Sequence, residues 1–235
     1  MFVPGDRPER FAKAQAAGAD GIIVDLEDAV TPATRPQARL NAAALLRDGD
    51  RRGPVWVRIN PVQTSDALPD LAAVVAARPD GIVLPKARTG ADLQRLDHWL
   101  EALEAQHGHT PGSIKVIALI RETAQAVLSG SSFIAPPARV IGYTWGAEDL
   151  AADVGASANR TVEGEFEYTF RLARAHCLLV AAAAGIGAYD TTDTEFRDVT
   201  AVERRAHAAR RDGFVGKLAI HPAQLDPIHK AFAPT

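Results

Sequence analysis

Short apolar runs rich in Val, Ile and Leu recur along the chain, and longer segments with helical spacing of apolar residues separate them. The runs predict eight strands, at Met1–Val3, Gly21–Leu26, Val55–Ile59, Gly81–Leu84, Lys115–Ile120, Val140–Tyr143, Ile186–Asp190 and Lys217–Ile220. The Ala-, Leu- and Arg-rich segments between them predict helices, among them Pro8–Ala17, Gln37–Arg47, Ala91–Gln106 and Glu167–Ala183. Strands and helices in alternation predict a parallel sheet covered by helices.

Eight strand–helix units in 235 residues fit one (β/α)₈ TIM barrel. No linker or composition shift marks a boundary, so we expect a single domain over residues 1–235. A doubly wound open sheet is the alternative fold. It would favour a Gly-rich phosphate-binding turn after an early strand, and the sequence has no G-x-G-x-x-G.

Polar side chains follow nearly every predicted strand at its carboxyl end. These residues include Asp6 and Arg7, Glu27 and Asp28, Asn60, Lys86, Glu122, Asp149, Asp190 and His221. In barrels of this kind the active site lies on the face where the strands end. The pattern therefore predicts a working site on that face.

Two of these residues, Glu122 and Asp149, suggest a metal site. Each follows a short buried strand, and they lie 27 residues apart, from position 122 to position 149, which is close to one strand–helix–strand unit of roughly 30 residues. At the same end of successive parallel strands they would face one pocket. Mg²⁺ commonly binds one or two protein carboxylates and keeps its other positions for water and substrate. Such a site polarises a carbonyl or stabilises an enolate.

Composition narrows the classes of function. The formal net charge of −3 gives no electrostatic footprint for nucleic acid, and no apolar run reaches the roughly 18 residues of a membrane span. No signal peptide is visible, so we expect a cytoplasmic protein. Cys177 is the single cysteine and lies in an apolar helical context, which predicts a buried core thiol rather than a nucleophile.

A set of segments spanning almost the whole chain carries a resemblance to a known family. They are Phe2–Phe11 (FVPGDRPERF), Val24–Val30 (VDLEDAV), Val57–Asn60 (VRIN), Leu84–Lys86 (LPK), Glu122–Ala124 (ETA), Trp145–Leu150 (WGAEDL) and Gly216–Pro222 (GKLAIHP). Because these segments occur in this order, the chain resembles the citrate lyase beta subunit-like and malyl-CoA lyase-like proteins of the HpcH/HpaI aldolase superfamily. The resemblance implies a (β/α)₈ barrel, Mg²⁺, a CoA thioester, an oxo acid, and a homotrimer or larger homo-oligomer.

The resemblance also assigns roles residue by residue. Glu122 and Asp149 match the metal ligands, and Glu122 lies where the substrate meets the metal. Arg58 matches the catalytic arginine that binds the substrate oxygens. Two further groups complete the match: Arg7 and Lys13 correspond to contacts of the CoA phosphates, and Glu27 and Asp28 to acidic residues around the metal and its waters.

The implied activity is a Mg²⁺-dependent carbon–carbon lyase acting on a 3-hydroxyacyl-CoA such as citryl-CoA or malyl-CoA, with an acyl-CoA and an oxo acid as products. Arg58 remains a cation throughout, so its expected role is to stabilise developing negative charge. Two other classes stay open: an aldolase acting on free oxo acids, and a non-catalytic subunit that binds an acyl-CoA or oxo acid within a complex.

Several site residues have structural alternatives. Glu122 could cap the following helix or pair with Arg121, and Asp149 could be the N-cap of a helix starting near Leu150. Arg58 could form an ion pair with Glu27 or Asp28. Alternation along a strand would let only one of those two acids reach the metal's waters, and Asp28 is favoured.

Four further residues carry weaker signals. Lys86 could form a Schiff base, but the nearby carboxylates favour an ion pair. Glu148 is expected to be solvated or structural, Asp153 to be a helix or loop partner, and His221 to be hydrogen-bonded rather than a base.

The resemblance leaves the general base unassigned. Malyl-CoA lyase-like members continue past the Phe-x-Pro segment, here Phe232–Pro234, into a helix and a mobile lid. An aspartate of that lid acts as the base in the neighbouring subunit's site. We expect this sequence to lack the C-terminal lid segment.

Overall fold

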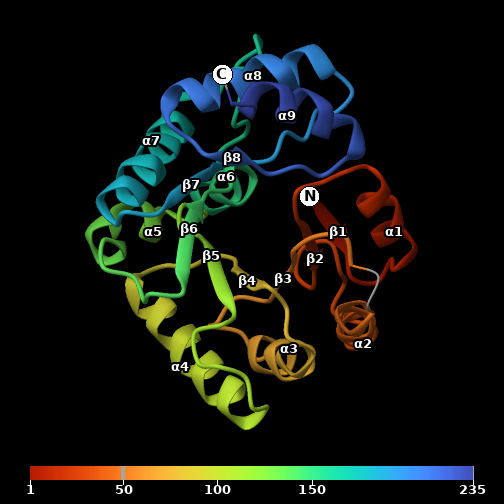
Figure 1. Ribbon diagram of the computed structural model, residues 1–235. Coiled ribbons are helices and arrows are strands. Elements are labelled where there is room, and N and C mark those ends of the chain that lie inside the picture. Colours follow the sequence, from red (N-terminus) through yellow and green to blue (C-terminus); the bar gives the residue numbers. More distant parts are fainter. Residues whose placement is uncertain (49–50, 235) are drawn as a thin grey trace.

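Eight parallel strands form one curled sheet in the order β1 to β8, with helices on its outside (Figure 1). The computed structural model describes residues 1–48 and 51–234. The strands are β1 Phe2–Pro4, β2 Ile22–Asp25, β3 Val55–Arg58, β4 Gly81–Leu84, β5 Lys115–Leu119, β6 Val140–Thr144, β7 Gly187–Asp190 and β8 Gly216–Lys217. The prediction of an eight-stranded parallel sheet is confirmed.

The helices cover the convex side of the sheet. They are α1 Glu9–Ala16, α2 Arg35–Arg47, α3 Ala67–Val74, α4 Gly90–Gln106, α5 Ala124–Leu128, α6 Ala147–Val154, α7 Tyr168–Ala183, α8 Val199–Asp212 and α9 Leu225–Phe232. The four predicted helices are present as α1, α2, α4 and α7, with ends displaced by at most two residues. No helix of the described segments is long and apolar enough to cross a membrane.

Alternation along the strands separates two apolar layers. In β2 and β3, Val24 and Val57 pack in the main core under the helices, whereas Ile23 and Trp56 belong to a smaller cluster inside the curl of the sheet. This is the period of two that a pleated strand imposes on its side chains. The main core contains most of the fully buried apolar residues, so the sheet and its helices form one layered unit.

The last strand differs from the prediction. The paired part of β8 is Gly216–Lys217 rather than Lys217–Ile220. In the described part of the chain, one backbone hydrogen bond, from Phe2 N to Ala219 O at 2.8 Å, joins β1 to the segment that follows β8, in place of a ladder. The sheet is therefore curled, and the fully closed barrel of the prediction is not established, because β8 is too short to pair along an edge.

Candidate functional site

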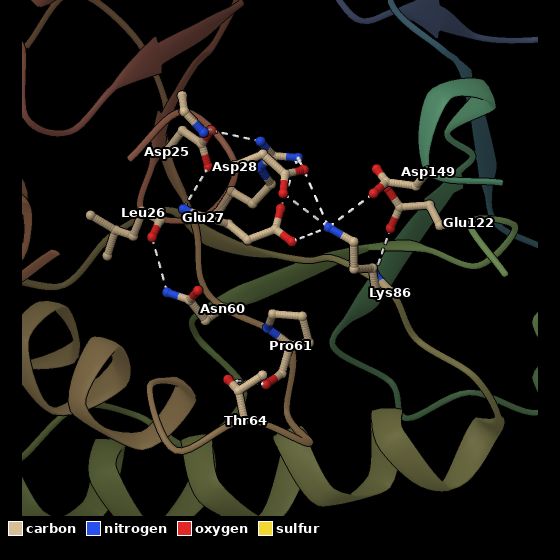
Figure 2. A network of polar contacts seen from close by, with 12 residues as sticks. Asp25, Leu26, Glu27, Asp28, Asn60, Pro61, Thr64, Lys86, Glu122 and Asp149 are labelled. Carbon is tan, nitrogen blue, oxygen red and sulfur yellow. Dashed lines mark hydrogen bonds and ion pairs between the residues drawn. The ribbon is translucent and has the colours of Figure 1, made fainter. Parts of the chain in front are cut away.

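Charged side chains from five successive strand ends gather on one face of the sheet (Figure 2). The cluster consists of Asp25, Glu27 and Asp28 from the end of β2, Arg58 from β3, Lys86 after β4, Glu122 after β5 and Asp149 from the first turn of α6. Five carboxylates thus face two cationic side chains. The structure brings together the predicted site residues of the metal and substrate groups.

The carboxylates of Glu122 and Asp149 lie next to each other (Figure 2). Glu122 is 1% exposed and its Oε2 accepts a hydrogen bond from the Lys86 backbone N–H at 2.5 Å. Burial raises the pKa of Glu122 well above its ordinary value, and the neighbouring carboxylates of Asp149 and Glu27 raise it further. Close carboxylates that repel one another and lack a full complement of counter-charge are suited to a divalent cation.

Gly146 makes room for this pair. A Cβ at position 146 would lie 2.8 Å from Glu122 Oε1 and 3.0 Å from its Cγ, which is closer than side chains tolerate. Gly146 is also the N-cap of α6, so Asp149 lies within the first turn of that helix. The alternative role of Asp149, as an N-cap of a helix starting near Leu150, is therefore excluded, because α6 begins at Ala147.

Lys86 supplies a cation at the centre of the cluster. Its Nζ contacts Glu27 Oε1 and lies 3.1 Å from both Asp28 Oδ1 and Asp149 Oδ1. Burial would lower the pKa of Lys86, but Glu27, Asp149 and Glu122 outweigh burial and raise it. The ion-pair interpretation of Lys86 is confirmed, and a protonated ammonium is unsuited to Schiff-base chemistry.

Arg58 is bound on both sides by acids. It binds Asp25 through two parallel hydrogen bonds, Nε to Oδ1 at 2.7 Å and Nη2 to Oδ2 at 2.6 Å, and its Nη1 lies 3.1 Å from Glu27 Oε2. Asp28 lies 3.5 Å away. The predicted ion pairs with Glu27 and Asp28 are present, but sequence reasoning missed Asp25. The register of β2 and β3 places Asp25 directly beside Arg58.

Both Glu27 and Asp28 contact Arg58 and Lys86, and the expectation that only Asp28 reaches the waters of a bound metal stays a prediction. β2 ends at Asp25, so strand alternation does not apply to the two residues that follow. Asn60 stabilises this turn by donating to Leu26 O at 2.9 Å. Burial raises the pKa of Glu27 to about 7 even though Arg58 and Lys86 act to lower it. Burial opposes ionisation of Asp28 as well, but there the two cations prevail and lower the pKa.

A pocket of about 360 Å³ opens beside the cluster. Arg58, Glu122 and Asp149 line it, together with Arg10 and residues of the loop after β7. A second pocket of about 320 Å³ adjoins it and contains Lys13. Phe2, Pro4, Arg10 and Ile220 line both. The two pockets therefore lie next to each other, and these four residues stand between them.

The two predicted CoA contacts differ in position. Lys13 lies in the second pocket, whereas Arg7 lines neither pocket. The Arg7 side chain is 61% exposed, and its Nε lies 3.9 Å from Asp6. Arg10, which sequence reasoning missed, lines both pockets, and its place one helical turn before Lys13 on α1 was the available signal.

The donor set fits Mg²⁺. Carboxylate oxygens are its preferred protein ligands, and one or two suffice when water and substrate complete the shell. Within residues 1–48 and 51–234, no three His, Cys, Asp or Glu side chains are arranged as ligands of one metal ion. Glu122 and Asp149, with Gly146 beside them and Lys86 among the acids, are the residues that would hold the ion.

The remaining candidates have structural partners. Asp153 accepts a hydrogen bond from Ala124 N at 2.7 Å, and Glu148 accepts one from Asn159 at 3.2 Å. His221 Nδ1 accepts from Ala223 N, which caps a short 3₁₀ turn. Cys177 is fully buried. The structural placements expected for these four residues are confirmed.

Comparisons with known proteins agree with this arrangement. The sequence profile of the HpcH/HpaI aldolase/citrate lyase family matches residues 1–222. A citrate lyase subunit beta-like protein of Mycobacterium tuberculosis is 36% identical over 235 residues, which cover this whole chain and 78% of that protein. A (3S)-malyl-CoA thioesterase of Cereibacter sphaeroides is 32% identical and is covered over 76% of its length, again by the whole chain.

A solved structure shares the fold. The crystal structure of protein CitE from Mycobacterium tuberculosis in complex with magnesium, acetoacetate and coenzyme A superposes with a TM-score of 0.85 at 36% sequence identity. The match covers all of this chain and 80% of that one. At this identity the likeness extends beyond the fold to the sequence.

Proposed function

Because this chain belongs to the HpcH/HpaI aldolase/citrate lyase family, we propose that it is a Mg²⁺-dependent carbon–carbon lyase. Its substrate would be a 3-hydroxyacyl-CoA, such as citryl-CoA or malyl-CoA, and its products an acyl-CoA and an oxo acid. The observation that carries this proposal is the carboxylate pair of buried Glu122 and half-buried Asp149, which line one pocket with Arg58. Magnesium, coenzyme A and an oxo acid bound to the related CitE support it.

Glu122 and Asp149 would hold Mg²⁺. When bound there, the ion polarises the oxygens of the hydroxy acid or oxo acid that it binds. Glu27 and Asp28 lie close enough to accept hydrogen bonds from waters around that ion, because both also contact Lys86. The chain's own acids thus define where the ion sits.

Arg58 would stabilise the negative charge that develops on the substrate. It is a permanent cation, since Asp25, Glu27 and Asp28 raise its pKa still further above the ordinary value despite its burial. The two hydrogen bonds to Asp25 fix the plane of the guanidinium before substrate binds. Such preorganised charge is the largest single contribution in many active sites.

The two adjacent pockets beside α1 would accept the CoA thioester. Arg10 and Lys13 provide positive charge for its phosphates, and Arg7 is near enough in sequence to join them at the surface. The apolar walls formed by Phe2, Pro4 and Ile220 suit the thioester arm. The acyl end would then lie beside Arg58 and the carboxylate pair.

The wider architecture follows from the same proposal. We infer that the sheet closes into a (β/α)₈ barrel as a single domain, which the hydrogen bond between Phe2 and Ala219 supports. Assembly as a homotrimer or larger homo-oligomer belongs to the proposal as well, and analytical ultracentrifugation of the purified chain tests it.

A product assay tests the reaction class. The full chain with Mg²⁺ is incubated with citryl-CoA, malyl-CoA and methyl-substituted malyl-CoA, and both the oxo acid and the free CoA thiol are measured. A lyase forms oxo acid and acyl-CoA without free thiol, and a thioesterase such as the Cereibacter relative would release free thiol. Loss of turnover in Glu122→Ala, with Glu101→Ala on the exposed face of α4 unaffected, would support the lyase.

Other outcomes separate the remaining classes. Cleavage of free hydroxy acids at equal rates, unaffected by Arg10→Ala or Lys13→Ala, would favour an aldolase that acts without CoA. Binding of CoA esters without any turnover of the whole panel would favour a binding subunit and contradict the lyase proposal.

A further inference from the structure

Lys86 contacts both members of the carboxylate pair through two different groups. Its backbone N–H donates to Glu122 Oε2 at 2.5 Å, and its Nζ lies 3.1 Å from Asp149 Oδ1. Figure 2 shows the ammonium pointing at Asp149 while the backbone of the same residue faces Glu122. One residue therefore fixes the two side chains that would bind the metal.

The same ammonium also balances the acids on the β2 side. It contacts Glu27 and Asp28, and the Lys86 side chain is 25% exposed. Arg58 reaches Glu27 and Asp28 from the other direction, but no contact joins it to Asp149 in the described part of the chain. Lys86 is thus the cation that links Asp149 to the rest of the cluster.

The backbone of Lys86 is held in an unusual conformation. Its φ is +50°, in the left-handed region that β-carbon-bearing residues avoid. Such a conformation persists where the surroundings determine it, and it is common at functional sites. Here the N–H to Glu122 and the ammonium among three acids both depend on the placement of this residue.

We propose that Lys86 is a positioning residue that acts as a tethered counter-ion: its ammonium compensates Asp149 in the metal-free protein and competes with Mg²⁺ for that carboxylate. The inference rests on the proposed Mg²⁺ site at Glu122 and Asp149. Two cations drawn to the same oxygens repel each other, and this repulsion is strong away from bulk water. Lys86 therefore lowers the affinity for Mg²⁺ while it keeps the empty site assembled.

Calorimetric titration of Mg²⁺ tests the competition directly. Lys86→Met keeps the backbone N–H and removes the charge, so we expect it to bind Mg²⁺ about tenfold more tightly than the wild type. Lys86→Gly also removes the charge and adopts a positive φ without strain, so it should show the same tightening. Lys86→Arg keeps the charge and should bind within about threefold of the wild type.

The matched control is Lys115→Met. Lys115 is exposed at the start of β5, and its Nζ donates to Gly112 O at 3.0 Å, so its loss should leave Mg²⁺ affinity unchanged. Unchanged or weaker Mg²⁺ binding by Lys86→Met, with the wild type binding normally, would overturn this inference and leave the proposed function standing. Absence of Mg²⁺ binding by the wild type would overturn both.

Thermal unfolding gives a readout that does not depend on activity. Without metal, Lys86→Met should melt several degrees below the wild type, because the acids lose their counter-ion. Saturating Mg²⁺ should restore most of that difference, since the ion replaces the missing charge. A deficit that Mg²⁺ leaves unchanged would indicate a purely structural lysine and contradict the proposal.

Discussion

Arg58 and Asp25 form a buried ion pair in which two parallel hydrogen bonds, of 2.7 and 2.6 Å, join neighbouring strands at their ends. The pair is possible because β2 and β3 are in register at these residues. Asp25 also accepts from the backbone N–H groups of Glu27 and Ala29. It therefore orients the guanidinium and supports the turn that carries the acids of the site.

Replacing Asp25 by Asn should destabilise the fold. The variant leaves Arg58 with one hydrogen-bond acceptor fewer and without its bidentate counter-charge, although Glu27 and Asp28 remain beside it. Losing a hydrogen bond between charged groups in this way costs about 2 to 3 kcal/mol. Urea unfolding measures the loss. Asp226→Asn, at an 88% exposed side chain of α9, is the control and should change stability by less than about 0.5 kcal/mol. A loss for Asp25→Asn as small as that control would contradict the account of the pair.

Gly146→Ala should disrupt the site while the fold survives. The new Cβ would lie 2.8 Å from Glu122 Oε1, so the carboxylate has to move away from Asp149. The φ of Gly146 is −132°, which alanine adopts freely, so backbone strain does not enter. We expect Mg²⁺ affinity, measured by calorimetry, to fall at least tenfold with little change in the circular dichroism spectrum. Gly53→Ala, where the nearest atom lies 3.7 Å away, serves as the control and should bind as the wild type does.

Asp190 makes the free energy of unfolding decrease as the solution becomes acidic. Burial opposes its ionisation, but Lys217 and Arg174 outweigh burial and hold its pKa below the ordinary value of about 3.9. As pH falls, Asp190 is therefore protonated in the unfolded chain before it is protonated in the folded chain. Its contribution to the free energy of unfolding is complete above about pH 5 and is lost as pH falls through the folded pKa. Asp190→Asn should be less stable than the wild type at pH 7, and its free energy of unfolding should fall less between pH 7 and pH 3. Urea midpoints between about pH 3 and 7 measure it, and an equally steep acid loss in the variant would exclude Asp190 as its source.

Cys177 should be unreactive in the native protein. Its thiol is fully buried in α7, and burial raises its pKa to about 12, so almost no thiolate forms at neutral pH. Ellman's reagent should detect no thiol in the folded chain and one per chain in guanidinium, because the sequence has a single cysteine. Rapid modification of the folded protein would show that α7 opens more readily than its packing indicates.

The sequence was sufficient for the elements whose local pattern decides their structure. The β-rich runs located β1 to β7 closely, because each is a short apolar segment bounded by turn residues. The carboxyl ends of these strands then located Glu122, Asp149 and Lys86 on one face. The bounds of β8 were not predicted correctly. The apolar residues Leu218 and Ala219 suggested a strand, but only Gly216 and Lys217 pair with β7.

Three features of the site depended on tertiary geometry. Asp25 became the partner of Arg58 through the register of two strands, which single-sequence patterns do not specify. Glu27 and Asp28 both reach the cations because β2 ends before them. The positive φ of Lys86 was not predictable from its residue type, because lysine has no preference for the left-handed region.

Calorimetric titration of Mg²⁺ into the wild type, Glu122→Gln and Asp149→Asn tests the central claim most directly. Both substitutions keep the size of the side chain and remove one carboxylate. We predict that one Mg²⁺ binds per wild-type chain. Mutation of a residue that only hydrogen bonds to a metal ligand typically lowers metal affinity 10- to 100-fold. Loss of a ligand itself should lower it more, so we predict Mg²⁺ affinities weaker by about 100-fold or more in both variants. Wild-type affinity in either variant would contradict the assignment of Glu122 and Asp149 as the metal pair.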